Sequence, residues 1–461
     1  MIPFTLAQVA AAVSGELVGG PAAAGVTVRG VTVDSRAVQP GDLFVAMSGE
    51  RVDGHDYVDA AVAAGAAAVL SERPTSAPGV VVPDVLAAVG GLARELLTRL
   101  DDVTVIALTG SSGKTSTKDI LGQVLSVAGP TIAPQGSFNN ELGLPLTVLR
   151  CDAGTGYLVL EMGARGLGHI AYLTAIAPPQ VGLVLNVGTA HVGEFGGQRA
   201  IARAKGELVA DLTPDALAVL NADDPLVRTM STPARVLTFG AAPDADVRLG
   251  EVQLDDLARP RFELSYGGAQ AQVQLQLSGE HMASNAAAAA AVALGLGMDL
   301  DEVAAALSAA QPQSRWRMEL HHSPEGVVIV NDAYNANPES MRAALKSLAA
   351  MAPEPPGRTW AVLGEMKELG AESLRAHDEI GRLAVRLDIS RLIVVGEGAR
   401  AMHLGAAQEG SWGDETTWVP DADAALAIVR EQVRPGDVVL VKASRALGLE
   451  RIADALVSGA S

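Results

Sequence analysis

Residues 103–118, VTVIALTGSSGKTSTK, contain the stretch that decides the fold class. A run of apolar and β-branched residues leads into a loop between Gly110 and Gly113, and a helical pattern follows at residues 115–127. Glycines allow the backbone to curl until its N–H groups converge on phosphate oxygens at the start of a helix. This strand–loop–helix order predicts a nucleotide-phosphate loop in an α/β domain.

The loop residues have distinct expected tasks. The Lys114 ammonium reaches the outer phosphates, and the Thr115 hydroxyl is a ligand for Mg²⁺. Because Leu108 stands where the longer motif has its first glycine, the loop is a shortened GxxGK[ST] variant. The alternative, a glycine-rich helix cap, is disfavoured by the strand before the loop and the helix after it. The expected ATP contacts of the loop are Gly110, Ser111, Ser112, Gly113, Lys114, Thr115 and Ser116.

Strand and helix patterns alternate on both sides of the loop, which is typical of parallel sheets covered by helices. Residues 241–276 differ, because apolar and polar residues alternate there and predict a small antiparallel sheet. The expected strands are residues 80–82, 103–108, 157–160, 181–187, 327–330, 360–363, 392–395 and 438–441. The expected helices are residues 115–127, 283–294, 338–350, 373–387 and 422–433.

Composition breaks near residues 83–91 and 311–314 predict three domains. The first spans residues 1–84. The second, residues 85–312, is a central P-loop-type domain that combines a parallel sheet with the small antiparallel sheet. The third, residues 313–461, is a Rossmann-like βα series.

Composition excludes several classes of protein. The 461 residues include 34 Lys+Arg and 53 Asp+Glu, and the net charge of −19 argues against nucleic-acid binding. The 49% of apolar residues excludes a disordered chain, and a single cysteine, Cys151, excludes a disulfide framework. The first sixteen residues lack the basic residues of a signal peptide, and the apolar residues 282–298 are mostly Ala and Gly, so they are a weak membrane candidate. We therefore expect a cytoplasmic monomer without stable membrane association.

Polar residues lie at the ends of two predicted strands. Glu161 ends the strand that begins at residue 157, and His191 follows the strand that begins at residue 181. Because ligands bind at the carboxyl edge of an open parallel sheet, these two side chains suggest a second Mg²⁺ site. Lys205, in ARAKGE, is by itself most simply interpreted as a solvated helix lysine.

Six widely separated runs resemble the Mur ligases, the ATP-dependent amide-forming enzymes of peptidoglycan precursor synthesis. The resemblance covers essentially the whole chain, and SFNNELGLP and NDAYNANPES are most similar to the member that adds a D-alanyl-D-alanine dipeptide. The runs are DSR (34–36), PGDLFVAMSGERVDGHDY (40–57), SFNNELGLP (137–145), NDAYNANPES (331–340), LGEMKELG (363–370) and VKASRALGLE (441–450).

This resemblance implies UDP-N-acetylmuramoyl-tripeptide and D-alanyl-D-alanine as substrates, with ATP and two Mg²⁺ ions as cofactors. It implies that residues 1–84 bind the UDP-muramoyl-peptide. The implied catalytic residues are Lys114, His191 and Lys205, with Lys205 carbamylated. The implied metal ligands are Thr115, Glu161, His191 and the Lys205 carbamate. Further ATP contacts implied outside the loop are Asn285, Arg317 and Asp332. The implied substrate contacts are Ser35 and Arg36 for the uridine diphosphate, Asn139 and Asn140 near the muramoyl group, and Tyr334, Asn335 and Asn337 on the C-terminal side.

Three other functions are weighed against this one. A Mur-type or folylpolyglutamate-type ligase for a different amine is disfavoured by NNELGLP and DAYNANP. A non-catalytic ATP-binding switch has no need for Glu161, His191 and Lys205 together. A mechanical P-loop ATPase is disfavoured because the sequence shows no evident arginine finger or coupling partner.

Overall fold

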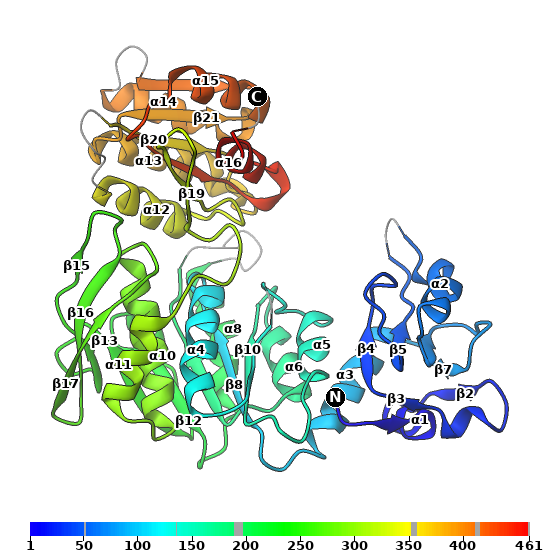
Figure 1. The fold of residues 1–461 in the computed structure, drawn as a ribbon. Helices are drawn as coiled ribbons and strands as arrows, with labels where there is room; N and C mark the ends of the chain where they lie inside the picture. Colours follow the sequence, from blue (N-terminus) through cyan, green and yellow to red (C-terminus); the bar gives the residue numbers. More distant parts are fainter. Residues whose placement is uncertain (50–51, 135, 189–196, 352–356, 411–414, 460–461) are drawn as a thin grey trace. The chain divides into compact units, whose positions relative to one another are not determined.

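The computed structural model describes residues 1–49, 52–134, 136–188, 197–351, 357–410 and 415–459 (Figure 1). The chain forms two compact units. The first comprises Met1–Leu108, Ala128–Gly163 and Gly168–Gly182, and the second comprises Thr109–Val127, Ala164–Leu167 and Leu183–Ser461. The three predicted domains, 1–84, 85–312 and 313–461, stay predictions.

The first unit begins with a five-stranded sheet in the order β2-β7-β6-β5-β4. Strands β4 to β7 are parallel neighbours, and β2 is antiparallel to β7. Its core includes Phe44 and Val69 on the sheet and Val58 and Ala61 on α2. The strands are β2 (Glu16–Val18), β4 (Gly30–Thr32), β5 (Asp42–Val45), β6 (Ala68–Ser71) and β7 (Gly79–Val81), with the separate antiparallel pair β1 (Phe4–Thr5) and β3 (Thr27–Val28). The helices are α1 (Leu6–Val13), η1 (Ala23–Gly25), η2 (Gly54–Tyr57), α2 (Val58–Ala63) and α3 (Val85–Leu97).

Three further strands of the first unit carry the segments that lead to the candidate site. Strand β10 (Tyr157–Glu161) is parallel to both β8 (Thr104–Thr109) and β9 (Thr131–Ile132). Its register pairs Glu161 with Leu108, so both strands end at the same edge. The associated helices are α5 (Gly143–Val148) and α6 (His169–Ile176).

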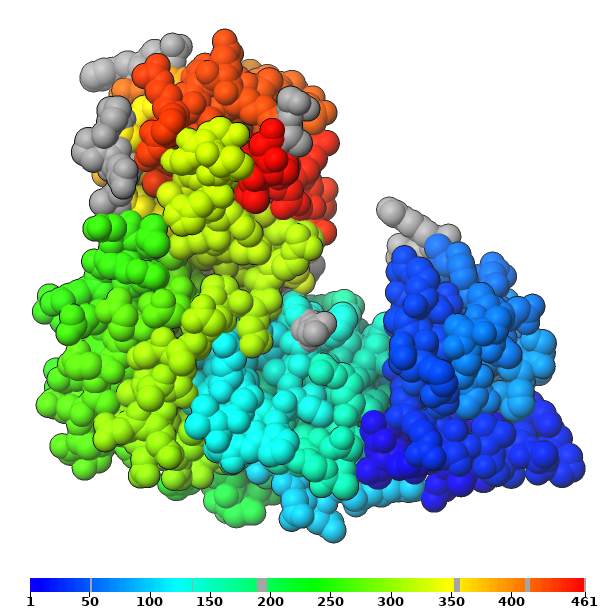
Figure 2. Space-filling model, viewed as in Figure 1, coloured from blue at the N-terminus to red at the C-terminus, as the bar shows by residue number. Residues whose placement is uncertain are grey.

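The second unit contains a sheet portion in the order β11-β12-β13-β14-β16-β15, with β17 paired to β16. Strands β12, β13 and β14 are parallel, whereas β14, β15 and β17 are each antiparallel to β16. The predicted antiparallel strands therefore extend the parallel sheet through β14. They form part of the surface drawn in green in Figure 2. The strands are β11 (Val181–Val184), β12 (Leu217–Asn221), β13 (Arg235–Gly240), β14 (Val247–Leu249), β15 (Gln253–Leu254), β16 (Pro260–Tyr266) and β17 (Ala269–Gln274).

Helix α10 (His281–Gly295) explains the apolar run near residue 282. It is buried on almost every side, because its alanines let it pack closely on β12, β13 and β14. Within the described residues, no helix is both long and apolar enough to span a bilayer. The other helices of this part are α4 (Lys114–Ala128), α8 (Gln198–Ala210), α9 (Pro225–Arg228) and α11 (Leu300–Ala309).

The C-terminal part of the second unit is a six-stranded sheet in the order β18-β19-β23-β20-β21-β22. Only β18 is antiparallel to its neighbour, so the predicted Rossmann-like pattern is confirmed. The strands are β18 (Glu319–His322), β19 (Val328–Asn331), β20 (Thr359–Leu363), β21 (Arg391–Val395), β22 (Thr416–Val419) and β23 (Val438–Lys442). The helices are α12 (Pro338–Ala350), η3 (Gly370–Glu372), α13 (Ser373–Arg386), η4 (Glu397–Ala399), α14 (Arg400–Glu409), α15 (Ala422–Gln432), η6 (Arg445–Leu447) and α16 (Glu450–Val457).

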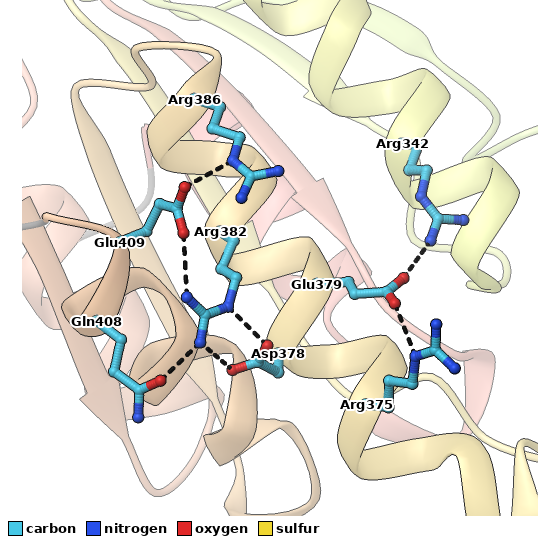
Figure 3. Close-up of polar contacts among 8 residues, drawn as sticks. All are labelled: Arg342, Arg375, Asp378, Glu379, Arg382, Arg386, Gln408 and Glu409. Atoms are coloured by element: carbon cyan, nitrogen blue, oxygen red, sulfur yellow. Dashed lines mark hydrogen bonds and ion pairs between the residues drawn. The ribbon is translucent and has the colours of Figure 1, made fainter.

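Helices α13 and α14 approach each other closely at two glycines. A Cβ at Gly381 would collide with the Met402 carbonyl, and one at Gly405 would collide with the Asp378 carbonyl. Figure 3 draws two groups of polar contacts on α13: Arg382 and Arg386 with Asp378, Gln408 and Glu409, and separately Glu379 with Arg342 and Arg375. Arg382 Nε lies 2.8 Å from Asp378 Oδ2 on its own helix, and its Nη1 lies 3.0 Å from Glu409 Oε2 on α14.

The mixed α/β fold with predominantly parallel sheets is the one that the sequence predicts. The main difference lies at the predicted strand 181–187, because β11 ends at Val184. The residues that follow leave the sheet and contact the phosphate loop, as described below.

Candidate active site

The loop between β8 and α4 has the geometry expected of a phosphate loop. Gly113 has a φ of +79°, and a Cβ there would lie 2.5 Å from Asn285 Oδ1. A side chain at this position would therefore be strained and would also collide with α10. Helix α4 begins at Lys114, and the Thr117 N–H donates to the Gly113 carbonyl at 2.9 Å. The N-terminus of a long helix thus follows directly on the glycine turn.

Two lysines lie near this loop. Lys114 Nζ donates to the Gly110 carbonyl at 2.6 Å. Lys205, on α8, is only 6% exposed. Burial, together with the positive charge of Lys114, holds the pKa of the Lys205 amine well below its usual range. Lys205 is therefore a buried amine in the phosphate-loop region, and the simplest interpretation of its sequence, a solvated helix lysine, is wrong.

Four other predicted loop contacts are half-buried or buried. Thr115 and Ser111 are buried, and Ser111 Oγ accepts a bond from the Gly188 N–H at 2.9 Å. Ser112 lies in the glycine turn, and Ser116 lies in the first turn of α4. Both are half-buried.

Helix α10 brings two polar side chains toward the second unit's candidate site. Asn285 lies against Gly113 and donates through Nδ2 to Met282 Sδ at 3.6 Å, so the structure brings this predicted ATP contact to the loop. One turn earlier lies His281, whose Nδ1 is buried. Burial lowers the pKa of His281, the Asp332 carboxylate opposes that shift, and the Lys442 ammonium adds to it.

In the first unit, Glu161 is held by two donors. Its Oε1 accepts from Ser137 Oγ at 2.9 Å and from Asn139 Nδ2 at 2.7 Å, and the side chain is almost completely buried. The Asn139 carbonyl also accepts from the Gly163 N–H at 2.9 Å. The structure thus places Asn139 on Glu161, and its predicted contact with the muramoyl group stays a prediction. Asn140 has a local task, because its Oδ1 accepts from the Gly143 N–H at 2.8 Å at the start of α5.

Ser35 and Arg36 lie in the N-terminal part of the first unit. Arg36 makes three bonds to Asp34: Nε to Oδ1 at 2.9 Å, Nη2 to Oδ2 at 2.8 Å, and its backbone N–H to Oδ1 at 3.0 Å. These bonds lower the pKa of Asp34 to about 2. The Arg36 side chain is 87% exposed, so the DSR run forms a turn with its guanidinium at the surface. A role in binding the uridine diphosphate stays a prediction.

In the C-terminal part, Lys442 connects two predicted site residues. Its Nζ lies 2.7 Å from Asp332 Oδ2 and donates to the Asn335 carbonyl at 2.8 Å. Asp332 Oδ1 also accepts from the Met318 N–H at 3.1 Å. Asn337 Oδ1 accepts from the Ser340 N–H at 2.8 Å and caps α12, so its side chain has a structural partner.

Arg317 is flanked by two residues in the left-handed region. Trp316 has a φ of +60° and Met318 has a φ of +49°, a conformation that non-glycine residues rarely adopt. The Arg317 guanidinium stacks on the Tyr334 ring at 4.2 Å, and that of Arg445 stacks on the Trp316 ring at 4.0 Å. Backbone strain of this kind is typical of functional sites.

Some functional candidates were not among the sequence predictions. Ser137, Asn186 and Lys442 each contact a predicted site residue through their side chains, and the Trp316 carbonyl accepts from the Tyr334 N–H at 3.2 Å. Ser137 and Lys442 lie within the quoted runs and Asn186 lies in the predicted strand 181–187, but no local pattern indicates which side chain each of them contacts. The predicted ligand His191 lies outside the described residues, and no group of three or more His, Cys, Asp or Glu gathers within the part that is described.

Three family models match the chain. They are the Mur ligase family, catalytic domain, over residues 27–95, the Mur ligase middle domain over residues 108–293, and the Mur ligase, glutamate ligase domain, over residues 316–445.

Relatives match the chain along its whole length. The UDP-N-acetylmuramoyl-tripeptide–D-alanyl-D-alanine ligase of Mycobacterium tuberculosis (strain H37Rv) is 51% identical over 501 residues, covering 99% of this chain and 98% of the relative. The crystal structure of MurF from Acinetobacter baumannii superimposes with a TM-score of 0.87 at 32% identity, covering 99% of both chains. The structure of MurF ligase from Thermotoga maritima in complex with ADP gives a TM-score of 0.80 at 32% identity, covering 94% of this chain and 97% of the other.

Proposed function

This chain belongs to the Mur ligase family, and on that premise we propose that it joins D-alanyl-D-alanine to UDP-N-acetylmuramoyl-tripeptide with ATP. The products are UDP-N-acetylmuramoyl-pentapeptide, ADP and phosphate. The observation that carries the proposal is the full-length similarity to relatives with that activity in their name, at 51% identity. The cytoplasm is the proposed location because ATP and nucleotide-linked sugars are cytoplasmic metabolites. A monomer without stable membrane association is proposed for the same protein.

The chemistry starts from a carboxylate, which is a poor acyl donor in water. The terminal carboxylate of the tripeptide attacks the γ-phosphorus of ATP, and ADP leaves with the electrons of the broken P–O bond. The resulting acyl phosphate is attacked by the amine of D-alanyl-D-alanine. The tetrahedral intermediate then expels phosphate, the nitrogen loses a proton, and an amide remains.

The main obstacle is the repulsion between anionic reactants. The phosphate loop offsets it with the N-terminus of α4 and the ammonium of Lys114. Arg317 supplies further positive charge in the C-terminal part, whereas the charge of Lys442 is balanced by Asp332. Local positive charge of this kind explains how a protein of net charge −19 can bind phosphorylated substrates.

The carboxylate of Glu161, at the end of β10, is a group suited to a divalent cation. A buried carboxylate is costly without a partner, and Ser137 and Asn139 fix it in one orientation at the end of β10. The proposed Mg²⁺ ligands are Thr115, Glu161, His191 and the carbamate of Lys205, and two ions are proposed. When bound, Mg²⁺ neutralises charge on the phosphates.

The surroundings of Lys205 support its proposed carbamylation. A neutral amine is the form that attacks CO₂, and burial favours the neutral form. The lysine nitrogen forms a bond to the carbon of CO₂ and releases one proton, which leaves an anionic carbamate. This product is an oxygen ligand suited to Mg²⁺, whereas an ammonium would repel the ion.

The test is an assay of ADP release with the purified chain, ATP, Mg²⁺, UDP-N-acetylmuramoyl-tripeptide and D-alanyl-D-alanine, followed by mass detection of the pentapeptide. ADP is expected only when both substrates are present. Lys114→Met should abolish turnover, and Lys346→Met, on the exposed face of α12, is the matched control that should leave it unchanged. Release of ADP with lysine or diaminopimelate in place of the dipeptide would favour a different ligase. Binding of ATP with no ADP formed under any condition would favour the alternative function, a non-catalytic ATP-binding switch.

A further inference from the structure

Asn186 lies two residues after the end of β11, and within the described residues its side chain makes its hydrogen bonds to the phosphate loop. Its Oδ1 accepts from the N–H groups of Ser111 and Ser112, each at 3.0 Å. Its Nδ2 donates to the Ser112 carbonyl at 3.2 Å. The Asn186 carbonyl also accepts from the Ser111 N–H at 3.1 Å. The one side-chain amide therefore pairs with the N–H groups of Ser111 and Ser112 and with the Ser112 carbonyl.

The chain on either side of Asn186 strengthens this arrangement. The Leu185 N–H donates to the Thr109 carbonyl at 2.9 Å, and the Gly188 N–H donates to Ser111 Oγ at 2.9 Å. At Gly110 a Cβ would lie 2.9 Å from Leu185 Cβ, so only glycine lets the two segments approach this closely. Asn186 thus lies at the centre of a continuous contact between the end of β11 and the loop.

A glycine-rich loop needs such a contact. Glycine loses more conformational freedom on ordering than any other residue, so a loop that begins and ends with Gly110 and Gly113 is held only by its bonds to the surroundings. A neutral amide is suited to this task, because it supplies both a donor and an acceptor without placing negative charge near phosphates. A carboxylate of the same shape would supply the acceptor but would repel them.

We propose that Asn186 is a positioning residue of the nucleotide site. Its amide holds residues 110–113 in the conformation that presents the N-terminus of α4 to the phosphates of ATP, and it does so without contacting the nucleotide itself. The inference deepens the proposed function and rests on it for the use of ATP. Asn186 is absent from the contacts that the family resemblance implies.

The experiment measures ADP binding by calorimetry in the presence of Mg²⁺ for the full chain and three variants. Asn186→Ala removes the contacts to the loop and should raise the Kd for ADP at least tenfold. Asn186→Asp keeps the shape and an acceptor, but it loses the donor to Ser112 and adds a negative charge. We expect a larger loss for Asn186→Asp, and the excess over Asn186→Ala should shrink as NaCl is raised.

The matched control is Asn221→Ala. Asn221 is a buried amide on the neighbouring strand β12, and its Nδ2 donates to the Leu185 carbonyl at 2.7 Å without contacting the loop. This variant should lower the melting temperature while leaving the Kd for ADP within twofold of the parent. In turnover, Asn186→Ala should raise the KM for ATP and leave the KM for the dipeptide unchanged.

Two outcomes overturn the inference. One is a Kd for ADP that stays within twofold of the parent in folded Asn186→Ala. The other is an equal loss of affinity in Asn221→Ala, which would mean that any weakening of this strand end has the same effect. If Asn186→Ala does not fold, the isosteric Asn186→Asp decides, and unchanged affinity there overturns the inference. ADP binding does not require ligation. If the variants change the Kd for ADP as expected but the parent chain forms no amide product, the proposed function is rejected and the inference about Asn186 stands. A parent chain that binds no ADP rejects both.

Discussion

Helices α4 and α8 each bury one lysine, and the two lysines have opposite electrostatic surroundings. On α4, Lys118 Nζ lies 2.6 Å from Asp119 Oδ1, and the two side chains are 0% and 8% exposed. On α8, Lys205 is buried, and within the described part of the chain no carboxylate lies within ion-pair distance of it. Its pKa is lowered by burial and by the like charge of Lys114. A buried cation paired with a carboxylate is costly to break because its partner would stay buried and charged, whereas a buried amine with a lowered pKa is a candidate for chemistry.

The largest expected effect is the loss of activity when Lys205 is replaced. Lys205→Ala should lower kcat by about a thousandfold or more, because an anionic group that holds metal and phosphate in place is lost. Added bicarbonate or chloride should restore part of the activity. The measurement is ADP release with both substrates present, and ¹³C NMR of the parent chain in labelled bicarbonate should show a carbamate. Full activity of Lys205→Ala without additives would contradict the assignment.

The next largest expected effect is the loss of stability when the ion pair between Lys118 and Asp119 is broken. Lys118→Met should destabilise the protein by about 3–5 kcal/mol, because it leaves the Asp119 carboxylate buried without its cation. Urea unfolding followed by circular dichroism measures the change. The double variant Lys118→Met/Asp119→Leu should recover most of the loss. If the double variant is no more stable than the single one, the ion pair is not the reason for the loss.

The pH dependence distinguishes the two lysines further. In CO₂-free buffer, the folded chain lowers the pKa of the Lys205 amine by burial, whereas the unfolded chain protonates this amine below about pH 10.4. Protons therefore favour the unfolded state in that window, and the stability of the parent chain should rise as the pH is raised toward 10. Lys205→Met lacks this penalty, so it should melt above the parent at pH 7, and the difference should shrink at pH 10. A difference that is constant with pH would reject a lowered pKa for Lys205.

The smallest effect concerns the charges drawn in Figure 3, which are partly exposed. Arg382 joins Asp378 and Glu409, yet all three side chains keep contact with water. Because exposed ion pairs are weak and screened by salt, Arg382→Ala should lower the melting temperature only slightly, and less in 1 M NaCl. Calorimetry at two salt concentrations measures this. A loss as large as that of Lys118→Met would remove the distinction between buried and exposed pairs.

Much of the fold could be predicted because its signals are local. The strand that ends at Thr109, the turn at Gly113 and the helix from Lys114 are consecutive in the chain, so spacing and residue type are sufficient to locate them. The same holds for α10, whose alanines are read directly as a helix. The antiparallel strands were predicted as well, but not their attachment to the parallel sheet through β14. Pairing partners depend on contacts that alternation alone does not specify.

The amino-acid sequence by itself determined which segments are strands, where the phosphate loop lies and which family the chain resembles, because each of these depends on neighbours along the chain. Only the tertiary structure decided that Asn139 holds Glu161, that Asn186 holds the loop and that Lys442 pairs with Asp332. The first two pairs are separated by 22 and 75 residues. The burial that lowers the pKa of Lys205 was decided in the same way, since it depends on what packs around α8. Hydrogen bonds and desolvation depend on which groups are close in space, and the packing of the folded chain determines which groups these are.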